Sequence, residues 1–394
     1  DKITILILTN SKSKKPEVVT GKLLKAADAL GLPCYPVVVS EAWIADNDIE
    51  QGTIKIKNHD GKENEVEIEA RETVVFVRAG ALDNETGLAL LGTLQNAGCF
   101  MINDRDGMLT CDNKMSAYTA FERNGINTPR TSLVNNEKSI PDAHERIGGQ
   151  FPVIIKTLTG TQGVGVSKVD SMESMMSVIQ SLWKFGATLI VQEFLKLDGD
   201  IRTIVMNGRI VASTKRIKPK KDFRSNRHMG AETEPYVLSD EEKKIVLAAA
   251  RATGSYMVGV DHAVVNKKIF ILECNGSPGL GSNFQNYDIT QIPQVPIKEK
   301  DILKFVLEYL QNPVHRRHKF NQESGYHETL EIVGYGDIRA KFDTGNGTNA
   351  SMFVVDKLDV SGKTAKWEKG GKKFTSKIIG ISKPDHVGKI DSLK

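Results

Sequence analysis

A glycine-rich segment between two apolar runs is one place where this sequence could bind a phosphate. The segment GTQGVGV spans residues 160–166 and follows the run PVIIK, which ends at Lys156. Its three glycines would let backbone amides approach phosphate oxygens, and the lysine would supply a positive charge. No Gly-Lys-Ser/Thr follows, so the segment is not a Walker loop. Taken alone, a glycine-rich hairpin turn without a ligand is the alternative.

Acidic and amide side chains in a later pair of apolar runs could hold a divalent cation. Glu273 and Asn275 are two residues apart in a predicted strand, so their side chains share one face, and Asp261 lies in the preceding run. Oxygen donors of this kind suit a magnesium ion that bridges phosphates. The alternative is that Asp261 caps a turn and that Glu273 is solvated at a strand end. Because an acid ending a nearly continuous apolar strand is unusual, and the glycine loop occurs with it, the cation site is favoured.

A basic segment lies between these two candidate sites. KRIKPKKDFRSNR, residues 215–227, contains seven Lys or Arg residues and one Asp. Such a cluster would attract phosphates, an acyl phosphate or an acidic acceptor. A solvated basic loop and an RNA contact are the alternatives, but Phe223 is the one aromatic residue here, which gives little support for base stacking. We therefore expect no direct nucleic-acid binding.

Alternating strand and helix patterns predict the elements that hold these residues. In the first 110 residues, apolar runs of strand length flank amphipathic stretches that end at glycines, which predicts a small α/β domain with a parallel sheet. A helix is predicted over 114–124, and around the glycine segment the order is strand, loop, strand, helix. The expected strands of the first domain are 3–8, 34–39, 74–77 and 99–102, and its expected helices are 18–30 and 85–97.

The second half of the chain contains a well-marked helix, a hairpin and a change of composition. Ser239 is a suitable N-cap and Gly254 a suitable stop for a helix over 240–253. The runs HAVVN and KIFILECN predict a hairpin about residues 266–268, and a further helix is predicted over 300–310. HRRHKFNQESG, residues 315–325, has the composition of a linker, and the tail from residue 328 has short alternating runs typical of a small all-β domain.

Composition and charge set broad limits on the class of protein. The chain has 394 residues, 40% of them hydrophobic, and a net charge of +4, which predicts several packed cores and leaves anion binding to local clusters. The four cysteines lie far apart, which favours free thiols in a reducing cytoplasm. The first apolar run is far shorter than the roughly 20 residues of a membrane span, so we expect no membrane insertion. A leader that precedes residue 1 stays open.

Six strings in the middle of the chain resemble the RimK-type branch of the ATP-grasp ligases, which append glutamate to protein or peptide carboxyl ends. In family order they are FPVIIKTLTGTQGVGV, VQEFL, DGDIRTIVMNGRIVAS, KDFRSNRHMG, GVDHAV and ILECNGSPGL, between residues 151 and 280. VRAG and CDNKMSAY extend the resemblance upstream, so that it covers roughly the first 310 residues. The resemblance implies an α/β (α+β) ATP-grasp fold, with an N-terminal α/β pre-ATP-grasp domain and a small all-β domain after it.

The resemblance also implies a role for each matching residue, with ATP and two magnesium or manganese ions as cofactors. The residues implied in nucleotide binding are Lys114, Lys156, Gly160, Thr161, Gln162, Gly163, Gly165, Glu193, Phe194, Asp200, Arg224, Ser225 and Asn226. Among them, Glu193 and Phe194 are expected at the hinge that reads adenine, and Asp200 on the ribose or adenine side. The implied metal ligands are Asp261, Glu273 and Asn275. The implied catalytic residues are Arg202, Arg216, Arg224 and Asn275. Of these, Arg202 and Arg216 are expected to hold the substrate carboxylate or the acyl phosphate, and Arg224 to Asn226 to line the nucleotide and substrate pocket.

The tail carries a separate motif with a different chemistry. DTG at residues 343–345 follows RAKF and resembles the retropepsin-like domain found beside RimK-type proteins, which is described as an ATP-dependent zinc protease. An aspartic protease needs two carboxylates that share a proton, and one chain supplies one such motif. Asn346 stands where that family commonly has alanine, and we expect the flap and closing strands to be incomplete in this tail. A substrate-docking or dimerising β domain, with Asp343 hydrogen-bonded in a tight turn, is therefore favoured over proteolysis.

Together these patterns predict a cytoplasmic ATP-dependent carboxylate–amine ligase that forms an amide through an acyl phosphate. The expected partners are an amino acid, with glutamate favoured, and a protein or peptide acceptor, and the resemblance implies self-association. The alternatives are a ligase for a small-molecule or carrier-protein carboxylate, an aspartic-type protease acting through Asp343 with regulatory ATP binding, and a non-catalytic ATP-sensing adaptor. The expected domains are 1–112 (pre-ATP-grasp), 113–190 (glycine-loop subdomain), 191–312 (metal-site subdomain), 313–327 (linker) and 328–394 (β-rich).

Overall fold

In the computed structural model of the chain, the first hundred residues form a parallel sheet with strand order β2-β1-β6-β7. Burial on both faces explains why these strands are nearly continuous apolar runs. Helices α1 and α2 connect strands of this sheet, as the sequence pattern predicts. The bounds are β1 Thr4–Thr9, α1 Val18–Ala29, β2 Cys34–Val38, β6 Thr73–Val77, α2 Glu85–Asn96 and β7 Phe100–Ile102.

Between β2 and β6 the chain inserts a small antiparallel sheet that the sequence analysis did not anticipate. Its strand order is β3-β4-β5, and the alternation of charged and apolar residues in IKIKNH and ENEVEIE is its signal in the sequence. Ile54, Ile56 and Ile68 are buried on one face and join the core of the parallel sheet. The bounds are β3 Ala42–Asp48, β4 Thr53–His59, β5 Glu63–Glu69 and η1 Ala70–Glu72.

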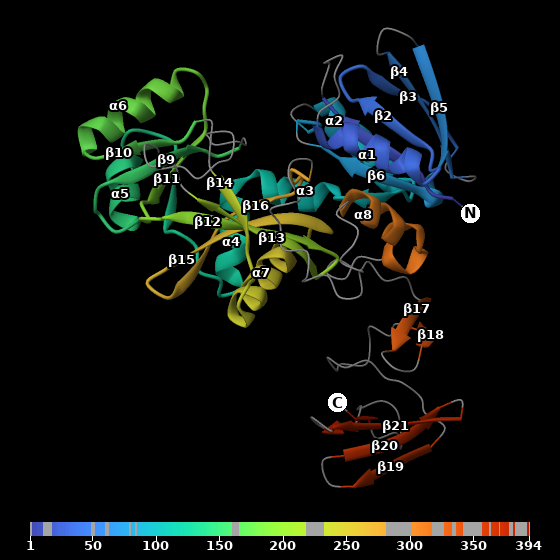
Figure 1. Cartoon of the computed structure of the whole chain (residues 1–394). Helices are drawn as coiled ribbons and strands as arrows, with labels where there is room; N and C mark the ends of the chain where they lie inside the picture. The colour runs from blue at the N-terminus through green and yellow to red at the C-terminus, as the bar shows by residue number, and fades with distance from the viewer. Residues whose placement is uncertain are drawn as a thin grey trace. The chain divides into compact units, whose positions relative to one another are not determined.

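A second sheet, with order β10-β9-β11-β8, follows two short helices (Figure 1). The strand, loop, strand, helix order expected around the glycine segment is confirmed, because β10 pairs antiparallel with β9 and α6 follows. Helices α5 and α6 pack on one face of the sheet in an apolar core. The bounds are α3 Arg105–Asp112, α4 Lys114–Arg123, β8 Thr131–Val134, α5 Ser139–Arg146, β9 Val153–Thr157, β10 Ser167–Val169, α6 Met172–Trp183 and β11 Leu189–Glu193.

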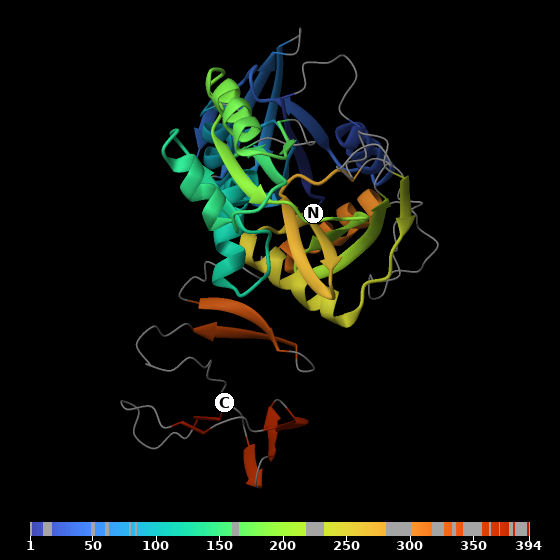
Figure 2. The same cartoon turned by 90° about the vertical axis from the view of Figure 1, so that its left-hand side faces the viewer.

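The largest sheet has five antiparallel strands in the order β14-β13-β12-β15-β16, with α7 over one face (Figure 2). The predicted capping of α7 is confirmed: Ser239 and Glu242 form a capping box, and Gly254 ends the helix with φ 69°. The predicted hairpin is also confirmed, with positive φ at Asn266 and Lys267. The bounds are β12 Gly199–Met206, β13 Arg209–Ile217, β14 Glu232–Pro235, α7 Asp240–Thr253, β15 Met257–Val265 and β16 Lys268–Asn275.

Helix α8 (Ile302–Gln311) packs against the first helix of the chain, α1. Its apolar face, which includes Leu303 and Leu307, packs with Val19 and Leu23 of α1 in one buried cluster. The same cluster contains residues of β1 and β12, so it joins the first sheet to the largest one. A short turn, η4 (Pro313–Arg316), follows α8.

The chain divides into two compact units, Asp1–Asn321 and Gln322–Lys394. In the second unit the described elements are all strands: β17 His327–Ile332, β18 Gly336–Lys341, β19 Lys357–Ser361, β20 Thr364–Lys369, β21 Lys372–Lys377, β22 Ile381–Ser382 and β23 Ser392–Leu393. Its likeness to a retropepsin-like domain stays a prediction, as do the finer domain boundaries.

The structure describes the following residues: 2–10, 18–48, 52–59, 63–78, 80–82, 85–159, 165–217, 232–280, 302–316, 327–332, 336–341, 357–361, 364–369, 371–377, 381–382 and 392–393. Each helix in these ranges is too short or too polar to cross a bilayer.

Candidate active site

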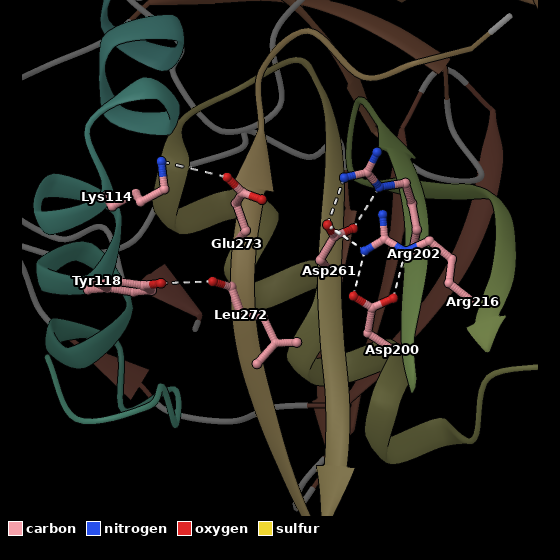
Figure 3. Close-up of polar contacts among 8 residues, drawn as sticks. All are labelled: Lys114, Tyr118, Asp200, Arg202, Arg216, Asp261, Leu272 and Glu273. Atoms are coloured by element: carbon pink, nitrogen blue, oxygen red, sulfur yellow. Dashed lines mark hydrogen bonds and ion pairs between the residues drawn. The ribbon is translucent and has the colours of Figure 1, made fainter. Parts of the chain in front are cut away.

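The first of the two expected phosphate-binding lysines begins α4. The side chain of Asn113 caps the helix by accepting from the backbone N–H of Ser116 at 3.0 Å, which places Lys114 in the first turn. The Lys114 Nζ lies 4.0 Å from Oε1 of Glu273 on β16 (Figure 3). Burial lowers the pKa of Lys114; the Glu273 carboxylate opposes this effect, and the nearby Lys156 ammonium adds to it.

The second lysine reaches the same place from a different sheet. Lys156 lies on β9, and its Nζ donates a 2.7 Å hydrogen bond to Oε1 of Gln192 on the neighbouring strand β11. Burial lowers the pKa of Lys156 as well, and the Glu273 carboxylate opposes this. The structure thus brings together Lys114, Lys156 and Glu273, which the sequence separates by up to 159 positions (273 − 114). Two cations and one anion leave a net positive site, which suits a phosphate chain.

Beside this lysine pair, Asp261 of β15 is held by two arginines (Figure 3). The guanidinium of Arg202 binds it in a bidentate manner, with Nε 2.6 Å from Oδ1 and Nη2 2.6 Å from Oδ2. Arg216 adds a third contact, with Nη2 2.8 Å from Oδ2. Burial would raise the pKa of Asp261, but the charges of Arg202 and Arg216 outweigh it and hold the pKa below its ordinary value.

Arg216 also binds a second carboxylate, that of Asp200. Its Nε and Nη2 lie 2.5 Å and 2.6 Å from the two Asp200 oxygens. Burial works against the charge of Arg216, yet the Asp261 and Asp200 carboxylates together raise its pKa above the ordinary value. The four side chains therefore form a buried network of zero net charge. The expected contact of Asp200 with ribose or adenine stays a prediction.

Strand register explains why this network forms. Asp200 lies opposite Arg216 in the β12/β13 ladder, Arg202 opposite Asp261 in the β12/β15 ladder, and Asp261 opposite Glu273 in the β15/β16 ladder. Directly opposed residues of antiparallel strands project to the same face, with their Cβ atoms about 4.5–5.5 Å apart. One face of the largest sheet thus carries a charged row, while on the other face the neighbouring residue His262 bonds to Glu242 of α7 at 3.1 Å.

The residues expected to hold a metal have the donor chemistry of a hard-cation site, because they offer carboxylate and amide oxygens. The two arginines contact the Asp261 carboxylate at three points, one on Oδ1 and two on Oδ2. The Nδ2 atom of Asn275 is buried and has no hydrogen-bond partner in the described protein; as a donor it suits a phosphate oxygen and not a metal. Among the described residues, no three His, Cys, Asp or Glu side chains gather to hold a metal. The expected set has two carboxylates and an amide.

The expected adenine hinge lies at the end of β11 and is fixed by Arg130. The Arg130 guanidinium donates to Oε2 of Glu193 at 2.9 Å and 2.6 Å, and its backbone N–H donates to Oε1 at 2.8 Å. The backbone N–H of Glu193 in turn donates to the Arg130 carbonyl. The Lys168 Nζ lies 5.2 Å from the centre of the Phe194 ring. The carboxylate of Glu193 is thus held by protein, and its part in reading adenine stays a prediction.

Several expected site residues lie outside the described part of the chain. Within the glycine segment, Gly165 is described and has a φ of +77°. A Cβ added at Gly165 would lie 2.8 Å from Cγ2 of Thr157, so the position favours glycine. The site residues outside the described ranges are Gly160, Thr161, Gln162, Gly163, Arg224, Ser225, Asn226 and Asp343. The roles expected for these residues, and proteolysis through Asp343, therefore stay predictions.

Two buried polar groups near the site were missed by sequence reasoning. Gln192 binds Lys156, and its signal is a polar residue inside the buried strand LIVQE. Glu242 accepts hydrogen bonds from the Tyr236 hydroxyl and the Ser239 backbone, in addition to its contact with His262. Burial would raise the pKa of Glu242, but the hydrogen bonds with His262 and Ser239 and the charge of His262 lower it to about 2. The pairing of Glu242 with His262 had no signal in the sequence, because the two are 20 residues apart on different elements.

Comparison with known proteins decides the family. A model of the RimK-like ATP-grasp domain matches residues 111–294. Probable alpha-L-glutamate ligase 1 of Shewanella sp. (strain MR-4) is 36% identical over 220 residues, which cover 55% of this chain and 73% of that protein. This chain belongs to the RimK-like ATP-grasp family. It is an ATP-dependent carboxylate–amine ligase.

Solved structures agree with this assignment at the level of the fold. The D-alanine–D-alanine ligase of Bacillus anthracis, complexed with ATP, superimposes with a TM-score of 0.56 at 16% identity, over 80% of this chain and 99% of that one. The ATP-grasp ligase PsnB, complexed with its minimal precursor, Mg and ADP, gives a TM-score of 0.54 at 19% identity, over 77% of this chain and 97% of that one. The expected ATP-grasp fold is thus confirmed, and the family uses ATP and magnesium.

Proposed function

We propose that this RimK-like ligase adds glutamate to the carboxyl end of a peptide or protein. Its similarity to a probable alpha-L-glutamate ligase supports glutamate as the amino acid, and the complex of PsnB with a precursor supports a peptide acceptor. Ligation to a small-molecule or carrier-protein carboxylate is the second candidate within the same chemistry. In both, the reacting groups are a carboxylate, an amine and the γ-phosphoryl group of ATP.

The observation that carries this proposal is the meeting of Lys114, Lys156 and Glu273 beside the arginine network. An oxygen of the acceptor carboxylate attacks the γ-phosphorus, and the bond to the β–γ bridging oxygen breaks to release ADP. The amine of the amino acid then attacks the acyl carbon, the bond to the phosphate oxygen breaks, and the nitrogen loses a proton. The two lysines neutralise charge on the phosphates, and no side chain need act as a nucleophile.

The arginines are placed to stabilise the acyl phosphate. Arg202 is the less buried of the two, with 19% of its side chain exposed against 7% for Arg216. We therefore assign contact with the reacting carboxylate to Arg202 and the positioning of Asp261 to Arg216. We also propose a catalytic role for Asn275 and Arg224 and a role in nucleotide binding for Ser225 and Asn226, on the family resemblance; Arg224, Ser225 and Asn226 lie outside the described ranges.

Asp261, Glu273 and Asn275 would hold magnesium or manganese, with two ions proposed. When bound, the ions neutralise charge on the β- and γ-phosphates. The unpartnered Asn275 Nδ2 would donate to a phosphate oxygen, and the Gly160 to Gly165 loop would close over the phosphates. Glu193 and Phe194 would form the adenine hinge.

A substrate screen tests the proposed function. The protein is incubated with ATP, magnesium, each amino acid in turn and a set of peptides, while ADP release and peptide mass are measured. We expect glutamate to give the fastest ADP release and the peptides to gain the mass of glutamate residues. ADP release that needs no peptide and gives no peptide product would overturn the peptide acceptor and favour the small-molecule alternative.

Two variants test the site itself. Lys156→Ala and Glu273→Gln should each lower ADP release by roughly tenfold or more, because each removes charge stabilisation from phosphoryl transfer. Lys243→Ala and Glu308→Gln are matched controls, since both side chains form surface ion pairs, with Asp240 and Lys304. Near-parental rates in both site variants would contradict the assignment.

A further inference from the structure

A chain of three hydrogen bonds leads from the Lys156 ammonium across the β10-β9-β11-β8 sheet. The ammonium donates to Oε1 of Gln192 at 2.7 Å, and Nε2 of Gln192 donates to the Thr131 hydroxyl at 2.8 Å. The Thr131 hydroxyl donates to the Pro129 carbonyl, also at 2.8 Å. Gln192 is 4% exposed, so water cannot easily replace any of these contacts.

Donor and acceptor counting fixes the orientation of the Gln192 amide. The Pro129 carbonyl can only accept, so the single hydrogen of the Thr131 hydroxyl is used on it, and towards Gln192 that hydroxyl can only accept. The Tyr118 hydroxyl donates to the Leu272 carbonyl at 2.9 Å, so towards the Gln192 side chain it too can only accept. The group of Gln192 that meets the Thr131 hydroxyl is therefore the amide nitrogen. The amide oxygen is left to face Lys156, and a flipped amide would set its NH₂ group against the ammonium.

Strand pairing explains why these groups meet. Thr131 lies directly opposite Gln192 in the β8/β11 ladder, and Lys156 lies opposite Ile190 in the β9/β11 ladder, so it is the diagonal neighbour of Gln192. Ile190 packs in the same apolar cluster as Tyr118 of α4. This face of the β10-β9-β11-β8 sheet is therefore turned towards α4, the helix that begins at Lys114.

We propose that Gln192 is a positioning residue that holds the Lys156 ammonium ready for the phosphates of ATP. A lysine side chain loses rotamer entropy when it is ordered, and a preformed contact removes part of that loss from the binding step. An amide oxygen does this without a formal charge, so the lysine keeps its full positive charge for the phosphates. A carboxylate at the same position would hold the lysine equally well but cancel that charge. The inference rests on the role proposed above for Lys156.

Calorimetric binding of the magnesium complex of a non-hydrolysable ATP analogue tests the inference, with no amino acid or peptide present. Gln192→Glu should weaken binding roughly tenfold, because an ionised carboxylate pairs with Lys156. Thr131→Val removes the acceptor that orients the amide and should weaken binding about threefold, whereas Thr131→Ser keeps the hydroxyl and should restore parental affinity. Gln180→Glu is the matched control: Gln180 bonds to Glu137 on the surface, and its variant should bind as the parent does.

The outcomes separate a positioning role from a structural one. Parental affinity in Gln192→Glu, or equal loss in Thr131→Val and Thr131→Ser, would overturn the proposal. If Gln192→Glu fails to fold, the two Thr131 variants decide alone. Because the assay uses no amino acid or peptide, a wrong assignment of glutamate or of the acceptor cannot affect it. Conversely, Lys156→Ala with parental nucleotide affinity would refute the role of Lys156 and the inference with it.

Discussion

Replacing Arg216 with methionine should remove the bidentate guanidinium contact from a buried carboxylate and destabilise the protein. Met is unbranched and fills part of the same space, so the main loss is the guanidinium. Asp200 would lose both of its contacts with Arg216, at 2.5 Å and 2.6 Å, whereas Asp261 would keep the bidentate contact with Arg202. Asp200 is 6% exposed, so water cannot fully replace the lost partner. The substitution therefore tests what the network contributes to stability.

The magnitude follows from the burial of the network. Removing one partner of a buried ion pair costs about 3–5 kcal/mol, because the remaining charge is left in a medium of low dielectric constant. For a unit of this size each kcal/mol lowers the melting temperature by roughly 2 °C, so Arg216→Met should lower it by about 6–10 °C. Asp200→Asn in the same chain removes the carboxylate charge that Arg216 would have balanced, and the double variant should recover a substantial part of the loss.

Thermal unfolding followed by circular dichroism, together with urea titration, measures these effects. Lys215→Met is a matched control on the same strand, because Lys215 makes an exposed ion pair with Glu234 at 3.5 Å. Surface pairs of this kind contribute about 0–1 kcal/mol, so the control should melt near the parent. Combining Arg216→Met with Asp200→Asn completes a double-mutant cycle, and its coupling term reports the pair itself.

Two results would refute this reasoning. One is an Arg216→Met variant that melts within about 2 °C of Lys215→Met, because a loss below 1 kcal/mol is that of an exposed pair. The other is strict additivity of the two stability losses in the cycle, because Asp200→Asn should relieve part of the loss caused by Arg216→Met. Either result would mean that the buried network is not the source of the expected stability.

Two further predictions concern the elements behind the site. Glu242→Gln should lower the free energy of unfolding at pH 7, and this loss should shrink as the pH falls from 4.5 towards 2. The reason is that the fold lowers the pKa of Glu242 from 4.5 to about 2, so the ionised carboxylate stabilises the folded state above the unfolded pKa. Urea midpoints of variant and parent at pH 7 and pH 3 measure this, and an equal difference at both pH values would contradict it. Gly199→Ala should lower the melting temperature, because the added Cβ would clash with the Arg216 carbonyl oxygen. Gly92→Ala in α2 is the control: its added Cβ meets no atom within 4 Å, so it should be neutral or stabilising. A Gly199→Ala variant as stable as the parent would contradict the packing argument.

Much of the fold of the first unit could be predicted from the sequence, because it depends on local patterns. The limits of α7 follow from Ser239 and Gly254, whose side chain and backbone freedom cap the helix wherever it packs. The β15/β16 hairpin likewise follows from two apolar runs joined by a polar turn. By contrast, the sheet β3-β4-β5 was missed, although its alternating residues carry a signal, because the charged outer face made the segment resemble a loop.

The candidate site could be predicted as a set of residues but not as a set of partnerships. Lys114, Lys156 and Glu273 have the right types for a phosphate and metal site, and the structure brings them together. The sequence also suggests Asp261 and Asn275 as metal ligands, which stays a prediction. It could not show that two arginines share the Asp261 carboxylate, because that follows from the register of three strand pairs.

The sequence by itself determined the periodicity of the elements, their caps and turns, and the residue types that could bind phosphate and metal. Those features depend on neighbours within a few positions along the chain. The tertiary structure alone decided that α8 packs against α1, that Gln192 holds Lys156, and that Glu242 meets His262. These contacts join residues 20 to almost 300 positions apart, and for the strand residues Lys156, Gln192 and His262 a shift of one residue in register would turn the side chain to the opposite face.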